Sequence, residues 1–142
     1  MSPTTSASSA AANRGWNIAL WSVQALLALL FVGTGLWKLL TPLPQLAAKI
    51  PWAGQVSPTF LYAIAAIDLA GGVGIIVPAL TRILPRLTLL AAVGIAALMV
   101  CAIVFHVRRG EAAVTPFNVF VVGLALFVLW GRLAKAPLGP RP

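Results

Sequence analysis

The sequence predicts an all-α integral membrane protein, a four-helix bundle whose two termini both lie in the cytoplasm. Of its 142 residues, 61% are hydrophobic and only 8% are charged, whereas soluble domains average about 45–50% and about 25%. The mean hydropathy is +1.00. Four apolar stretches have the length of about 20 residues that crosses the hydrocarbon core as a helix, and short polar or proline-containing segments separate them.

The four stretches divide the chain into two tails and one membrane domain. Residues 1–15, rich in Ser, Thr and Ala, are predicted to form a disordered tail. The first span should be retained, because the segment before it lacks the charge and cleavage site of a signal peptide. Residues 132–142 are predicted to form a basic tail. The membrane domain covers 16–131, with spans at about 16–40, 59–80, 87–107 and 112–130.

The connection between the first two spans is interrupted by prolines, which exclude a continuous helix. A short interfacial turn is expected over Gln45–Ile50, with Trp52 beside it. Ser57 is a candidate N-cap for the second span, and the following proline suits the first helical position. In the fourth span, Thr115 and Pro116 mark an alternative helix start. The interrupting prolines are Pro42, Pro44, Pro51 and Pro58.

The net charge of +8 is explained by basic residues that meet anionic lipid headgroups. Six of the ten fall on the side of the termini and four on the other, so the positive-inside rule favours cytoplasmic termini. No basic run exceeds two residues, which argues against nucleic acid as a partner. The six are Arg14, Arg82, Arg86, Arg132, Lys135 and Arg141, and the four are Lys38, Lys49, Arg108 and Arg109.

Polar residues of the spans gather in the outer half of the predicted bundle. Asp68, one of only two acidic residues, lies near the middle of the second span, where ionisable groups are candidates for function. Each of the other spans contributes to the same half, whereas the inner half contains little besides Gln24. The candidate site residues are therefore Asp68, His106 and Lys38 for chemistry, with Thr34 and Asn118 for substrate binding.

Each of these residues also has a structural interpretation. Asp68 could fix helix packing as a hydrogen-bond donor, and the rise per residue makes contact with Lys38 a long reach, so their pairing stays open. His106 is assigned first to the headgroup zone and second to proton exchange. Asn118 suits an interhelical hydrogen bond as well as a ligand contact. With one histidine and two acids, no metal site is expected.

Three runs in this order resemble the DoxX and DoxX-like small membrane proteins: FVGTGLWKL at 31–39, IDLAGGVGIIVP at 67–78, and VFH at 104–106. The resemblance covers about residues 17–132. It implies a four-helix membrane bundle, with the lysine, acid and histidine of the family at Lys38, Asp68 and His106. The acid is commonly Glu in the family, so Asp68 is a shorter variant. Family members are associated with redox systems, including quinone-linked sulfur oxidation and oxidative-stress complexes.

The resemblance thus implies a multi-pass protein of the bacterial cytoplasmic membrane, acting in a redox or stress-response system and handling quinone or another lipophilic small molecule. Two alternatives stay open. One is a small intramembrane enzyme, an isomerase or cyclase, with Asp68 as general acid. The other is a scaffold without chemistry for partner proteins. Whether the protein is an enzyme, whether quinone is its cofactor, and whether it forms a homo-oligomer are left undecided by the residues alone.

Overall fold

The computed structural model describes residues 3–142, with side chains from Ser8 onward. Its elements, in chain order, are α1 (Pro3–Leu40), α2 (Leu43–Lys49), the 3-10 turn η1 (Pro51–Gly54), α3 (Pro58–Thr81), α4 (Arg86–Arg108), the 3-10 turn η2 (Ala112–Val114) and α5 (Thr115–Ala134). No strand occurs among the described residues. Four of these helices are long and apolar enough to cross a membrane, so the predicted all-α membrane bundle is confirmed.

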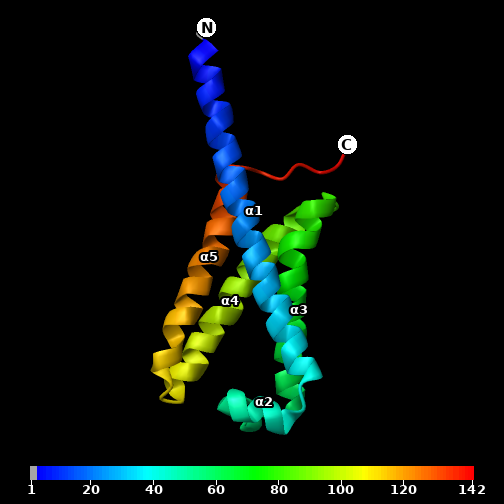
Figure 1. Ribbon diagram of the computed structural model, residues 1–142, viewed down its shortest axis with the longest axis vertical. Helices are drawn as coiled ribbons and strands as arrows, with labels where there is room; N and C mark the ends of the chain where they lie inside the picture. Colours follow the sequence, from blue (N-terminus) through cyan, green and yellow to red (C-terminus); the bar gives the residue numbers. More distant parts are fainter. Residues whose placement is uncertain (1–2) are drawn as a thin grey trace.

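The four long helices form a closed ring in which α1 packs on α3, α3 on α4, α4 on α5, and α5 on α1 (Figure 1). Both termini lie at one end, called here the terminal end; the opposite, distal end is the one predicted to face outward. Toward the distal end the α1–α3 pair and the α4–α5 pair diverge, and α2 lies across the opening (Figure 1). Many of the side chains exposed on the outer face are large and apolar, as contact with lipid requires; Leu29, for example, is 75% exposed.

α1 and α3 approach closely because glycines replace side chains at their contact. A Cβ at Gly72 would lie 2.8 Å from the backbone N of Val32 and 3.1 Å from the carbonyl oxygen of Ala28. A Cβ at Gly35 would lie 2.9 Å from the carbonyl oxygen of Ala65. Small residues of this kind drive helix association in lipid, where apolar side chains gain nothing by leaving a solvent that is already apolar.

The capping residue and the short helix expected in the first connection are both present in the structure. The hydroxyl of Ser57 accepts a hydrogen bond from the backbone N–H of Phe60 at 3.2 Å, so Ser57 caps α3 with Pro58 as its first residue. α2 falls close to the turn expected over 45–50. Between α3 and α4, Arg82 and Leu84 adopt left-handed conformations, with φ of 56° and 49°, and these turn the chain sharply.

Two boundaries differ from the sequence prediction. α1 continues back to Pro3 through the segment predicted as a disordered tail, where the alanines at positions 7 and 10–12 favour the helix; residues 1–2 of that tail lie outside the described part. α5 continues to Ala134, so Arg132 belongs to the helix and not to the basic tail. Arg132 is also buried and bonded to Gln24, so the inner half is more polar than predicted.

Candidate functional site

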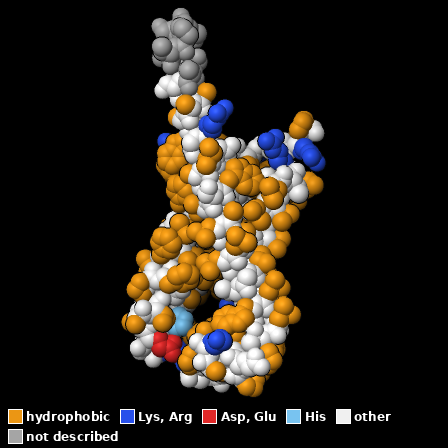
Figure 2. Space-filling model, in the orientation of Figure 1, with side chains coloured by type: hydrophobic (Ala, Val, Ile, Leu, Met, Phe, Trp, Pro, Cys, Tyr) orange, Lys and Arg blue, Asp and Glu red, His pale blue; other side chains and the backbone are white. Residues whose placement is uncertain are grey.

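A cavity of about 240 Å³ lies at the distal end of the bundle, where Figure 2 shows the molecule hollowed next to its acidic and histidine side chains. Leu30 and Phe31 of α1, Ile64 of α3 and Met99 of α4 supply parts of an apolar wall. The five residues that the sequence nominated also line it, so the structure brings together side chains from all four long helices: Thr34, Lys38, Asp68, His106 and Asn118.

Lys38 and Asp68 form an ion pair across α1 and α3, with Nζ and Oδ2 2.5 Å apart. The Lys38 side chain is 13% exposed and that of Asp68 is 4% exposed. The sequence left this contact open, because each residue was placed relative to the centre of its own helix. The helix register differs from that assumption. Gly35 packs level with Ala65 and Leu69, so Lys38 stands only about 6 Å along the axis from Asp68 at 1.5 Å per residue.

Aromatic side chains close the cavity near the surface. Trp52, in η1, lies with its ring centroid 5.9 Å from the Lys38 ammonium and 5.8 Å from the ring of Phe105. Phe60 of α3 stacks on Phe105 with a centroid separation of 6.5 Å. The sequence marked Trp52 only as a neighbour of the interfacial turn. Its position between Pro51 and the start of α3 holds it over the cavity, where it favours a cation at Lys38.

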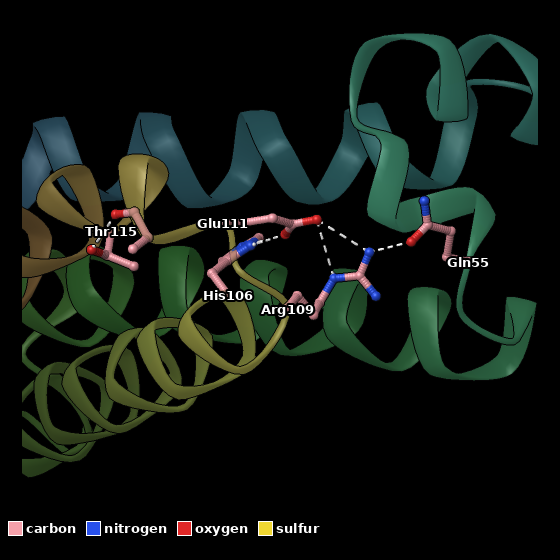
Figure 3. Close-up of polar contacts among 6 residues, drawn as sticks. Gln55, His106, Arg109, Glu111 and Thr115 are labelled. Atoms are coloured by element: carbon pink, nitrogen blue, oxygen red, sulfur yellow. Dashed lines mark hydrogen bonds and ion pairs between the residues drawn. The ribbon is translucent and has the colours of Figure 1, made fainter.

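His106 lies in the cavity wall and also belongs to a polar chain that leads to the surface (Figure 3). Its Nδ1 is 2.7 Å from Oε2 of Glu111, and the Nε of Arg109 donates to Oε1 of Glu111 at 3.2 Å. Arg109 also donates to the Gln55 side chain. This contact ties the distal end of α4 to the segment that carries Trp52. His106 therefore combines the two positions that the sequence treated as alternatives, cavity and headgroup zone.

Glu111 is the site residue that the sequence analysis missed. Its hydrogen bonds from Arg109, and then from His106, hold the pKa of its carboxyl below the ordinary range. Because an ionised carboxylate only accepts hydrogen bonds, the Nδ1 of His106 must be the donor in their contact. The Nε2 of His106 is then the nitrogen left for a ligand. Glu111 lies in a turn outside the spans, which is why helical spacing could not connect it to the histidine.

Thr34 and Asn118 complete the polar lining. The Thr34 hydroxyl lies 3.4 Å from the carbonyl oxygen of Phe31, within its own helix. Asn118 is 9% exposed, and its amide has no hydrogen-bond partner among the residues that the structure describes. Its donors are thus free for a ligand. Cys101 of α4 also lines the cavity and is exposed. Within the described chain, no three potential ligands cluster around a metal position.

Comparison with known protein families identifies a match. A family model described as the DoxX-like family matches residues 22–128. That range covers most of the chain and includes every residue of the cavity named above. No curated protein and no solved structure matches the sequence.

Proposed function

Because the chain belongs to the DoxX-like family, we propose that it is a membrane component of a redox or stress-response system and that its distal cavity binds a quinone or a similar lipophilic molecule. The observation that carries the proposal is the cavity itself. It lies between the candidate membrane spans, its walls are apolar and aromatic, and a few polar groups converge on it. That combination is the usual character of a small-molecule site.

The size of the cavity supports a ring-sized group. Its volume of about 240 Å³ is slightly below the usual lower bound of about 300 Å³ for ligand pockets. A quinone ring would lie beside Phe105 and Phe60 in the cavity, while a lipophilic tail would leave between the diverging helix pairs. The exposed Cys101 at the cavity edge is consistent with an opening toward lipid.

The polar groups suit the recognition of a carbonyl oxygen. Lys38 has three N–H donors and uses one on Asp68. Asn118 adds an amide whose donors are free. The two donors come from neighbouring helices of the ring, α1 and α5, and together they would fix the orientation of a ligand. The Lys38–Asp68 ion pair keeps the ammonium in place instead of letting it extend to the surface.

His106 supplies a route for protons. A quinone takes up two electrons and two protons on reduction, and the electrons would come from a redox partner of the system. The Nδ1–H of His106 donates a hydrogen bond to Glu111. The Nε2 of His106 can therefore accept a proton from a ligand hydroxyl or, when the ring is doubly protonated, donate one. Glu111, with a side chain 33% exposed, links that nitrogen to the surface.

An acid–base enzyme with Asp68 as general acid is the second candidate. No contact favours it, because the carboxyl of Asp68 is already occupied by Lys38. A scaffold role for partner proteins needs no cavity at all. Two observations therefore distinguish the proposal from both alternatives: which molecule occupies the cavity, and whether binding of that molecule depends on Lys38.

The test is purification in a mild detergent, followed by native mass spectrometry and an absorbance spectrum of the solvent extract. We expect a quinone to co-purify with the wild type and to fall at least tenfold in Lys38→Gln. Lys49→Gln is the matched control, since Lys49 is exposed on α2 outside the cavity. A wild type that carries no quinone and binds none when a short-chain analogue is added would overturn the proposal.

A further inference from the structure

We propose that the terminal end of the bundle contains a second binding site, for a phosphate-bearing anion, with the buried guanidinium of Arg132 as its central group. Arg132 lies in the last turn of α5 and is 3% exposed. The two acidic side chains of the protein, Asp68 and Glu111, are both at the distal end and both occupied. Arg132 therefore has no carboxylate counter-ion within the described chain, although a buried cation is stable only when it is paired.

The partners that Arg132 does have are all neutral. Its Nε donates to Oε1 of Gln24 at 2.8 Å, and its Nη1 donates to Oδ1 of Asn17 at 2.8 Å and to the carbonyl oxygen of Ala136 at 3.2 Å. Nη2 is buried and has no partner in the described part of the chain. Proximity to the negative end of α5 accounts for the bond to Ala136, but it leaves the burial of the charge and the free Nη2 unexplained.

The arrangement is held in advance of any ligand. Gln24 is fully buried and donates its own Nε2 to the carbonyl oxygen of Ile75 at 2.7 Å, so its oxygen cannot turn away from Arg132. The guanidinium also lies 5.1 Å from the ring centroid of Trp21. Gly131 faces Leu20 without a side chain of its own, which lets α1 approach closely enough for these contacts. A fixed guanidinium fork is the geometry that binds phosphate oxygens in pairs.

Space for the anion lies beside α1. A hollow of about 530 Å³ is lined by residues of this helix, among them Asn17 and Trp21, which also contact Arg132. Arg132 does not itself line this hollow. Asn17, which covers its Nη1, is exposed, so rotation of the Asn17 side chain would open the guanidinium to an anion in the hollow. Arg14 lines the same hollow and stands one helical turn before Asn17. The site would thus present two cations to one anion.

The depth and surroundings of the site indicate which anion fits. It lies at the terminal end of the spans, where lipid headgroups would be, and Ile18 on the same hollow is 61% exposed where acyl chains would run. The headgroup of an anionic phospholipid therefore meets both the charge and the apolar flank. Free phosphate shares the group that Arg132 would recognise but not the apolar contact. The experiment separates these two sources.

The experiment measures the thermal unfolding midpoint of the purified protein by near-ultraviolet circular dichroism, with dioctanoyl phosphatidylglycerol, inorganic phosphate, or chloride at equal ionic strength. A ligand that binds only the folded protein raises the midpoint with its concentration. We expect phosphatidylglycerol to raise the midpoint of the wild type. An equal rise with phosphate would show that the phosphate group suffices, and a rise with the lipid alone would identify the lipid as the source.

Three variants test the assignment to Arg132. Arg132→Gln should weaken the apparent affinity at least tenfold, whereas Arg86→Gln, which removes an exposed cation of the same end, should leave it unchanged. Asn17→Asp places a carboxylate on Nη1. It should raise the midpoint without ligand and abolish the response to ligand, and it decides the matter if Arg132→Gln fails to fold. Equal losses in the two arginine variants would indicate diffuse attraction and overturn the proposal, as would a wild type that responds to neither probe.

Discussion

Lys38 and Asp68 are joined across α1 and α3 by a contact of 2.5 Å at the floor of the distal cavity. The pair has two consequences. It supplies a partner for a carboxyl group buried in the membrane, where an unpaired charge is costly. It also draws a lysine that would otherwise extend to the surface into the cavity wall, beneath the ring of Trp52. Stability and ligand recognition therefore depend on the same two side chains.

The first prediction concerns the energy of this pair. Lys38→Gln and Asp68→Asn should each lower the free energy of unfolding by about 3 kcal/mol, the low end of the range for breaking a buried pair, because Lys38 keeps some exposure. The double variant should lose less than the sum of the two, by about 2 kcal/mol, because neither charge is then left alone. Reversible unfolding in mixed detergent micelles measures all three.

Lys49→Gln is the control for that cycle and should stay within about 0.5 kcal/mol of the wild type, as exposed surface changes do. Strict additivity of the two single variants would contradict the prediction, since it would mean that the two side chains do not interact in the folded protein.

The sequence could predict the bundle and the main polar residues of the cavity, but not its aromatic wall or the contacts within it. Hydropathy and helix signals identify spans and caps such as Ser57, and the polar residues of each span point to one half of the bundle. The register between helices is decided by how closely they pack. The approach at Gly35 and Gly72 brings Lys38 within reach of Asp68, and no periodicity within a single span contains that information.

The structure differs from the sequence prediction at two further residues, Glu111 and Arg132, for similar reasons. Glu111 lies in a turn, so no helical spacing relates it to His106, although the two are five residues apart and in contact. Arg132 was treated as a surface cation because basic residues near helix ends usually extend to the headgroups. It is buried because Gly131 allows α1 to pack against this end of α5, and that depends on a neighbour distant in sequence.

A second prediction tests the close approach of α1 and α3. Gly72→Ala introduces a Cβ that would lie 2.8 Å from the backbone N of Val32, and the helices must separate to accept it. We expect a loss of about 1–3 kcal/mol of stability, as for other overpacked sites. Gly33→Ala is the matched control, because nothing lies within 4 Å of the added Cβ, and it should be neutral or slightly stabilising. A Gly72→Ala variant as stable as Gly33→Ala would contradict the proposed packing.

A third prediction concerns Trp52 as part of the ligand site. Trp52→Ala removes the ring beside Lys38 and Phe105, and with it a stacking surface worth about 1.5 kcal/mol. Affinity for a short-chain quinone should therefore fall about tenfold. Trp37→Ala provides the comparison, because Trp37 is exposed and outside the cavity. Quenching of tryptophan fluorescence by the quinone gives the affinities, and equal effects of the two changes would contradict a role for Trp52.

The last prediction concerns the charge of Glu111, whose pKa is lowered by its hydrogen bonds from Arg109 and, to a lesser extent, from His106. Because the folded protein lowers this pKa, the interaction stabilises the fold above the ordinary pKa of a glutamate. It is lost as the pH falls through the lowered value. Glu111 is the only glutamate in the sequence, so protein labelled with ¹³C-glutamate gives a single side-chain carboxyl resonance. Its titration midpoint in detergent should lie below that of a glutamate in a model peptide, about 4.3.

Two variants resolve the cause of that shift. Arg109→Gln should return the midpoint of Glu111 toward the ordinary value further than His106→Gln does, because Arg109 makes the larger contribution. Arg108→Gln, beside it and exposed, should leave the midpoint unchanged. A wild-type midpoint at or above the model-peptide value would show that the chain from His106 through Glu111 to Arg109 does not form in the membrane protein, and the proposed proton route to the cavity would fail with it.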